Sequence, residues 1–157
     1  MANASSYVSM QDELRISTYT WPTTAEPARG VVQIAHGLAE HGSRYARFAG
    51  ALNSAGFHAI ASDHRGHGSS ITDTPGDFGA QGFAALWSDI EQLGESLRLD
   101  HPNLPLFLFA HSMGSFAAQH VLIERSDLYD GVVLSGSTTL DVLAANMADA
   151  PAGDLSV

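Results

Sequence analysis

Short apolar runs separated by turn-forming residues make up the first part of the chain. Residues 6–21 alternate weakly between apolar and polar and are rich in Tyr, Val, Ile and Thr, which predicts two short strands joined by a turn at 11–13. Prolines and a glycine make 21–30 a loop. The apolar runs at 31–36 and 57–63 are each short enough to form a buried strand.

Apolar residues recur at helical spacing in two longer stretches. The first predicts a helix over about 44–55, which Gly56 ends because glycine tolerates the left-handed backbone of a helix C-terminus. The second predicts a helix over about 82–99. A third helix is expected to follow Ser112, over about 113–125. One face of the first helix is formed by Tyr45, Phe48, Ala49 and Leu52.

Two further apolar runs, 106–110 and 131–136, complete a pattern of two strands followed by alternating strands and helices. Continuous apolar strands are typical of parallel sheets buried on both faces. The pattern therefore predicts a three-layer α/β fold with an open, mostly parallel sheet and right-handed crossovers. Because sites in such folds lie at the carboxyl ends of strands, we expect loops 37–43, 64–70 and 111–114 to gather on one rim.

Length and charge narrow the classes of protein to which the chain can belong. Its 157 residues suit one domain with a real core, and a formal charge of -10 argues against nucleic-acid partners. It has no cysteine, which excludes disulfides, thiolate zinc sites and a cysteine nucleophile. The first residues lack the basic and apolar regions of a signal peptide, and no apolar run approaches the roughly 20 residues of a membrane span. We therefore expect a cytoplasmic protein.

The stretch Ala110-His111-Ser112-Met113-Gly114 places a serine between small residues, after a predicted strand and before a predicted helix. This is the sequence context of a nucleophile elbow, a tight turn that presents a serine hydroxyl at the end of a strand. The flanking residues are small because a larger side chain would collide with the neighbouring strand or helix. A chance occurrence of small residues around a serine is the alternative interpretation.

The loop HGLAEHGSRY, residues 36–45, follows the strand after which this architecture carries an oxyanion-binding loop. Acyl transfer needs two N–H donors directed at the developing negative charge. The backbone amides of Leu38 and Met113 are the candidates. Glu40 and Arg44 lie four residues apart near a helix start, where an ordinary surface ion pair is the alternative.

The loop DHRGHGSS, residues 63–70, follows the next strand, and its two glycines allow a sharp turn. We interpret it as a structural loop beside the rim of the site. His64 and His67 have the appearance of metal ligands, but no third ligand accompanies them in the sequence, so a metal site is not predicted.

These three motifs, at these separations, resemble the monoacylglycerol lipase and lysophospholipase group of α/β-hydrolases. The resemblance extends over about residues 29–136 and is carried most specifically by the motif HGLAEHGSRY, residues 36–45. It implies the α/β-hydrolase fold, with a cap that begins near residue 137 and selects the acyl chain.

The resemblance also implies roles for individual residues. Ser112 is the expected nucleophile, with the amides of Leu38 and Met113 as oxyanion donors. Glu40 and Arg44 are expected near the polar end of the pocket, where a glycerol headgroup would lie.

The expected reaction is hydrolysis of a carboxylic ester of the monoacylglycerol or lysophospholipid type through an acyl-enzyme. Its substrate is a small-molecule acyl ester, and neither a metal nor an organic cofactor is implied. A transient contact with a lipid surface is expected through the cap.

The 157 residues do not contain a complete catalytic triad in the usual order of Ser, then Asp or Glu, then His. One histidine, His120, follows Ser112, and it lies about 12 Å of helix rise further along the third predicted helix. No histidine follows any later acid. The aspartates after Ser112 are Asp127, Asp130, Asp141, Asp149 and Asp154.

We therefore expect residues 1–136 to be the N-terminal part of a hydrolase core and residues 137–157 to be the start of a cap. Alone, the chain is expected to be nearly inactive, since loss of the triad histidine elsewhere costs about a million-fold in turnover. Two alternatives stay open: another activity on the same fold, such as an aminopeptidase or thioesterase, or a non-catalytic half that binds a partner.

Overall fold

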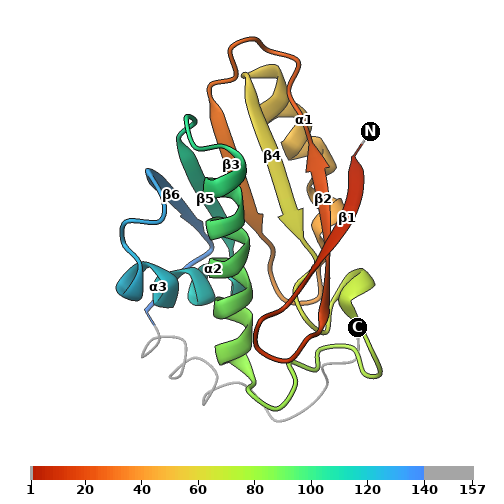
Figure 1. Ribbon diagram of the computed structural model, residues 1–157. Coiled ribbons are helices and arrows are strands. Elements are labelled where there is room, and N and C mark those ends of the chain that lie inside the picture. Colours follow the sequence, from red (N-terminus) through yellow and green to blue (C-terminus); the bar gives the residue numbers. More distant parts are fainter. Residues whose placement is uncertain (1, 140–157) are drawn as a thin grey trace.

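The computed structural model describes residues 2–139, which form a six-stranded sheet with helices on both faces (Figure 1). The strands lie in the order β1-β2-β4-β3-β5-β6. Their bounds are β1 Asn3–Val8, β2 Arg15–Trp21, β3 Gly30–Ala35, β4 Phe57–Ser62, β5 Leu106–His111 and β6 Gly131–Ser135. The expected start of a cap at 137–157 falls almost wholly outside the described residues.

Strands β3 to β6 run parallel to one another, whereas β1 and β2 form an antiparallel extension on the β4 edge. The predicted open, mostly parallel sheet is therefore confirmed. Since parallel strands end at the same edge, the loops after β3, β4 and β5 meet on one rim, as the sequence pattern predicts.

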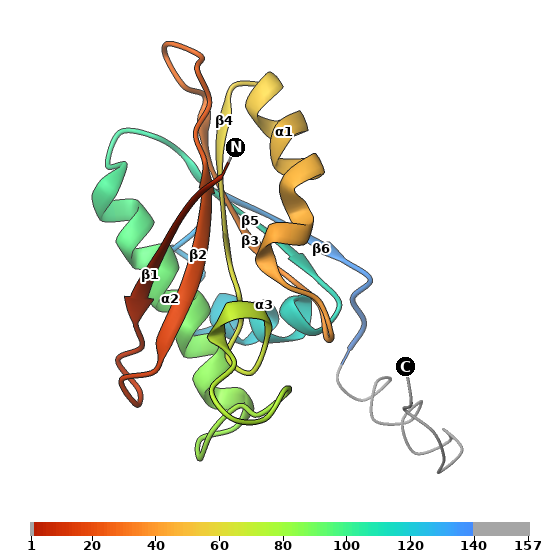
Figure 2. The same cartoon turned by 90° about the vertical axis from the view of Figure 1, so that its right-hand side faces the viewer.

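The helices divide between the two faces of the sheet (Figure 2). One face is covered by α1, and the other by α2 and α3. None of the helices that the structure describes is both long and apolar enough to cross a membrane. Their bounds are α1 Ala46–Ser54, α2 Phe83–Asp100 and α3 Met113–Glu124.

Strand β3 is buried on both faces, which explains its continuous apolar run. Val31 packs into the core on the α2 and α3 side, and Val32 packs into the core on the α1 side. The polar exception is Gln33, which donates to the carbonyl of Ile90 in α2 and accepts the hydroxyl of Tyr129. These bonds satisfy an amide that would otherwise be costly to bury.

Two local boundaries differ from the sequence pattern. The turn between the first strands spans residues 9–14. It is closed by a hydrogen bond of 2.8 Å from the Ser9 amide to the Leu14 carbonyl oxygen. The helix expected from residue 44 begins instead as a 3-10 turn, Gly42–Tyr45, and becomes α-helical at Ala46. The 3-10 turn packs closely against β4, since a Cβ on Gly42 would lie 2.9 Å from the Ser62 carbonyl oxygen.

Arg65 anchors the loop after β4 through a buried ion network. Its fully buried guanidinium contacts Asp89 of α2 at 2.7 Å and Asp12 of the first turn at 2.8 Å. The Phe78 carbonyl accepts a further bond from it at 3.0 Å. A buried cation with several partners is costly to break, so this network fixes the loop against both the N-terminal hairpin and α2.

Strand β6 lies at an edge of the sheet and is only partly covered. Its Val133 is 56% exposed. Beside it, an apolar groove of about 400 Å³ extends toward α1 over the aromatic side chains of Phe48, Phe57, Phe107 and Phe109. An exposed apolar edge of this kind is prone to association.

Candidate active site

Ser112 lies in the tight turn between β5 and α3, with φ 48 and ψ -118. Positive φ is strained for a residue with a Cβ, and strain of this kind concentrates at functional sites. A Cβ on Gly114 would lie 2.6 Å from the carbonyl oxygens of Ala35 and His36, so glycine is required there. The predicted elbow geometry is therefore present around this serine.

The two peptide groups that flank Gly37 are fixed by three hydrogen bonds. The His36 carbonyl accepts from the Gly114 amide at 3.1 Å, and the Gly37 amide donates to Glu40 Oε2 at 3.0 Å. His36 Nδ1 lies 2.7 Å from the Gly37 carbonyl oxygen. Of the four backbone groups in these two peptides, only the Leu38 N–H has no partner among the described residues.

The Met113 amide likewise has no acceptor in the part of the chain that the structure describes. Leu38 and Met113 belong to segments in direct contact, because a Cβ on Gly37 would lie 3.2 Å from Cβ of Ser112. Two free N–H groups beside a serine hydroxyl are what an oxyanion site requires. The role of these donors nevertheless stays a prediction.

The turn after Gly37 carries its own strain. Ala39 has φ 57, which costs a residue with a Cβ roughly 1–2 kcal/mol. The Glu40 side chain folds back across the turn onto the Gly37 amide. The carboxylate therefore closes a strained turn whose outer residue, Leu38, is 61% exposed.

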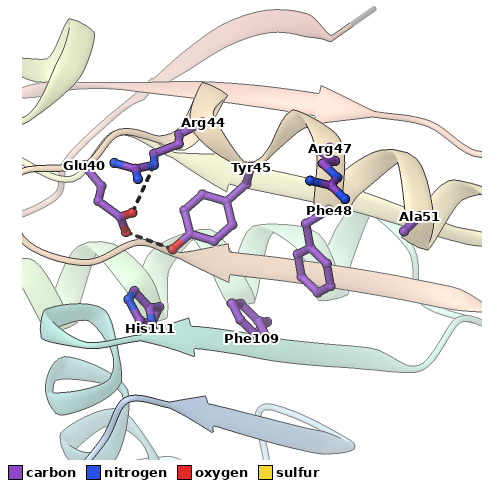
Figure 3. A pocket seen from close by; sticks show the side chains of 8 residues that line it. All are labelled: Glu40, Arg44, Tyr45, Arg47, Phe48, Ala51, Phe109 and His111. Carbon is purple, nitrogen blue, oxygen red and sulfur yellow. Dashed lines mark hydrogen bonds and ion pairs between the residues drawn. The ribbon is translucent and has the colours of Figure 1, made fainter.

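Glu40 and Arg44 form the expected i,i+4 pair, but the pair is not an ordinary surface contact (Figure 3). Arg44 Nε lies 3.3 Å from Glu40 Oε1, while the Tyr45 hydroxyl donates to Glu40 Oε2 at 3.0 Å. Burial acts to raise the pKa of Glu40, but the bonds from Gly37 and Tyr45 and the charge of Arg44 outweigh it and lower the pKa. The carboxylate is thus held ionised.

A cavity of about 510 Å³ opens beside this carboxylate. Its polar side chains are those of Glu40, Arg44, Arg47 and His111, and Figure 3 shows the aromatic rings of Tyr45, Phe48 and Phe109 along it. His111, the neighbour of Ser112, therefore faces the cavity, and its Nδ1 lies 3.3 Å from Ser135 Oγ. The arrangement combines a charged rim with an apolar wall.

The rings of three histidines from two loops pack against one another at tilted angles beneath the rim. The ring of His36 lies 4.0 Å from that of His64 and 5.3 Å from that of His67, between centroids. Burial lowers the pKa of His36 to about 4 and that of His64 well below its ordinary value. Both are neutral near pH 7, and among residues 2–139 no cluster has the ligands for a metal ion.

Asp63 links the first two loops, a role that the sequence pattern did not reveal. Its fully buried carboxylate accepts the Gly42 amide at 2.6 Å, the Ser69 amide at 2.7 Å and the Tyr19 hydroxyl at 3.0 Å. A Cβ on Gly68 would overlap the same carboxylate. The available signal was the Asp at a strand end followed by a glycine loop, a position where a side chain commonly caps backbone amides.

The hydroxyl of Ser112 has no hydrogen-bond partner within residues 2–139. His120 is engaged elsewhere, with its ring stacked on Trp87 at 3.7 Å between centroids. Asp127 and Asp130 pair with Arg125 and Arg98 on the surface. The other aspartates that follow the serine, Asp141, Asp149 and Asp154, lie outside the described residues.

Comparison with known proteins gives consistent results. A family model described as serine aminopeptidase, S33, matches residues 26–149. The chain is 32% identical over 146 residues to the monoglyceride lipase of Homo sapiens, covering 87% of this chain and 47% of the relative. It is 35% identical over 130 residues to the monoacylglycerol lipase of Mycolicibacterium smegmatis, covering 78% of this chain and 42% of the relative.

Among solved structures, a thermostable carboxyl esterase from Bacillus coagulans in complex with glycerol superposes with a TM-score of 0.83 at 30% identity. The match covers 93% of this chain and 47% of the esterase chain. The chain thus spans about half the length of the relatives that it matches. It belongs to the serine aminopeptidase S33 family of α/β-hydrolases and resembles the N-terminal part of monoacylglycerol lipases.

Proposed function

We propose that these residues form the nucleophile and oxyanion half of a serine hydrolase that cleaves carboxylic esters of the monoacylglycerol or lysophospholipid type. The observation that carries the proposal is the pair of free amides, Leu38 and Met113, on segments packed against Ser112 at a strained elbow. This combination supplies a nucleophile and an anion site together.

In the proposed reaction, Oγ of Ser112 attacks the ester carbonyl, and its proton passes to a general base. The carbonyl oxygen becomes an oxyanion and is bound by the N–H groups of Leu38 and Met113. Collapse of the tetrahedral intermediate releases the alcohol and leaves an acyl-enzyme, which water hydrolyses to a fatty acid. We place the base and its acid in sequence beyond these 157 residues, as the chain order of the fold requires.

The cavity beside Glu40 and Arg44 is the proposed site of the alcohol part of the substrate. A carboxylate held ionised and an exposed guanidinium offer an acceptor and donors to hydroxyl groups. The names of the human and Mycolicibacterium relatives and the glycerol in the Bacillus esterase complex support a glycerol-like group. The matched family description favours an aminopeptidase as the second candidate, in which the Glu40 carboxylate pairs with a substrate amine.

Assays of a protein that contains this chain and the further length of its relatives test the proposal. Monoacylglycerols, lysophospholipids and aminoacyl anilides are compared at equal concentration, with Ser112→Ala as the control. Hydrolysis of the esters that is lost in the control is the expected result. If only the aminoacyl anilides are hydrolysed, the lipase proposal is wrong and the aminopeptidase candidate takes its place.

The isolated chain provides a second test. No general base lies within hydrogen-bond distance of the Ser112 hydroxyl among the described residues. We therefore expect a fluorophosphonate probe to label the 157-residue chain far more slowly than the longer protein. Equal labelling rates would show that the chain carries its own base.

A further inference from the structure

His36 is buried directly beneath the peptide that carries the predicted oxyanion donor. Its side chain is 0% exposed, and it lies at the end of β3 with its ring against the rings of the two other histidines of the rim. No step of the proposed reaction uses it. Both of its ring nitrogens have partners, however, and these partners determine where its proton lies.

The tautomer of His36 follows from the backbone groups that it contacts. The His64 amide is an obligate donor, and it lies 2.9 Å from His36 Nε2, which must therefore accept. In a neutral imidazole the proton then resides on Nδ1. That nitrogen lies 2.7 Å from the Gly37 carbonyl oxygen, which can only accept. Both contacts are satisfied by one tautomer.

Fixing the Gly37 carbonyl fixes the Leu38 amide. The two groups belong to one trans peptide, in which the C=O and N–H bonds point in opposite directions. With the carbonyl turned inward onto His36, the N–H of Leu38 must face away from the buried ring, toward the exposed rim.

We propose that His36 is a positioning residue: its neutral Nδ1–H tautomer, set by the His64 amide, holds the Gly37–Leu38 peptide in the orientation that offers the Leu38 N–H to the oxyanion. The inference rests on the proposed function for its catalytic consequence. Its structural part, the tautomer and the orientation of one peptide, holds independently of any activity.

A direct test measures the tautomer in the 157-residue chain. Long-range proton–nitrogen correlation spectra of ¹⁵N-labelled protein near pH 7 distinguish a protonated from an unprotonated ring nitrogen. We expect His36 to carry its proton on Nδ1 and to have a bare Nε2. A proton on Nε2 would overturn the inference, whatever the protein is found to catalyse.

Two matched variants separate positioning from stability. His36→Asn keeps an N–H donor at the place of Nδ1 but leaves the His64 amide without its acceptor. His36→Gln offers an acceptor at the place of Nε2 but loses the donor to the Gly37 carbonyl. Each substitution thus removes one of the two bonds, and their unfolding midpoints in urea show the purely structural cost.

In the longer protein we expect kcat of His36→Gln to fall about a hundredfold with KM nearly unchanged, the scale on which loss of one oxyanion donor acts. The kcat of His36→Asn is expected to stay within about tenfold of wild type. Equal losses in the two variants, or losses that follow their unfolding midpoints, would contradict the inference. If the longer protein cleaves no ester at all, the proposed function fails, while the tautomer measurement still decides the positioning role.

Discussion

The Gly114 amide donates to the carbonyl of His36 across 3.1 Å, so the loop that carries one predicted oxyanion donor is bonded to the turn that carries Ser112. The two segments lie 78 positions apart in sequence yet share one hydrogen bond and a van der Waals contact. The pairing of β3 with β5 and this close backbone approach together set the position of Ser112 relative to the predicted donor, and a methyl group at Gly114 would clash within the approach.

Replacing Gly114 by Ala should destabilise the chain by roughly 1–3 kcal/mol, the usual cost of overpacking a close contact. The new methyl would lie 2.6 Å from two backbone carbonyl oxygens, which cannot rotate away. Urea unfolding followed by circular dichroism measures the change. Gly50→Ala in α1 is the matched control, since nothing lies within 4 Å of its Cβ, and helix propensity predicts a gain of about 0.5–1 kcal/mol. If Gly114→Ala leaves the unfolding free energy unchanged, the close backbone approach at this position is refuted.

Ser112→Gly should stabilise the chain by about 1 kcal/mol, because glycine adopts φ 48 without the strain of a Cβ. Ser112→Ala removes the same hydroxyl but keeps the Cβ, so it should leave the unfolding free energy nearly unchanged. Comparing the two variants in urea isolates the backbone strain. Equal stabilities would mean that no strain is stored at this turn.

Asp63→Asn should cost roughly 2–4 kcal/mol. The variant has one acceptor oxygen for three donors, and its new N–H₂ group must face either the Gly42 amide or the Ser69 amide together with the Tyr19 hydroxyl. Thermal and urea unfolding provide the measurement, with Asp73→Asn on the exposed loop as the control. If Asp63→Asn lowers the unfolding free energy no more than the control does, Asp63 does not link the two loops.

Arg65→Met should destabilise the chain by about 3–5 kcal/mol, because Asp89 is left buried without its cation. Arg65→Met combined with Asp89→Leu should recover much of this loss, since the unpaired charge is then gone. Arg125→Met, which breaks ion pairs at the surface, should have a far smaller effect. A double variant no better than Arg65→Met alone would argue against an electrostatic origin.

Stability should fall as the pH drops from 7 to 5. Burial lowers the pKa of His36 to about 4, so the unfolded chain, with an ordinary histidine pKa near 6.5, binds the proton more readily than the folded chain. The stability contributed by the neutral ring is fully present above about pH 6.5 and is lost progressively toward pH 4, with a total of roughly 3 kcal/mol. His64 acts in the same direction.

Urea midpoints measured at intervals between pH 7 and 5 provide the check. The His36→Asn variant should show a shallower decline, because it has one proton fewer to take up on unfolding. A decline of the same slope in the variant would assign the effect to other groups.

Hydrophobic spacing predicted the sheet and most of the helices, and the small residues around Ser112 predicted its tight turn, because these features depend on local pattern and on burial of both faces of β3. It did not reveal that Asp63 joins two loops, or that the Glu40 carboxylate accepts a bond from the Gly37 amide. Their roles depend on which loops meet after folding, and such contacts join residues far apart in the chain. The tautomer of His36 is of the same kind, since it is set by the amide of His64 on another strand end.

The interpretation of Glu40 and Arg44 changed most. The spacing predicted a surface pair, and the family resemblance implied a headgroup contact. The structure adds a bond that neither predicted, because the Gly37 amide donates to the Glu40 carboxylate. A side chain that folds back onto its own turn leaves no periodic signature. The strained φ of Ala39 leaves none either, since alanine is not a residue that signals left-handed backbone.

The bonds that immobilise the Leu38 donor and the Ser112 turn all come from residues 36–135. During ribosomal synthesis, which proceeds from the N-terminus, this part of the chain emerges early. The proposed oxyanion site can therefore take its geometry before any later part of the chain is synthesised. In this design the proposed anion site depends on no described residue that follows Ser135.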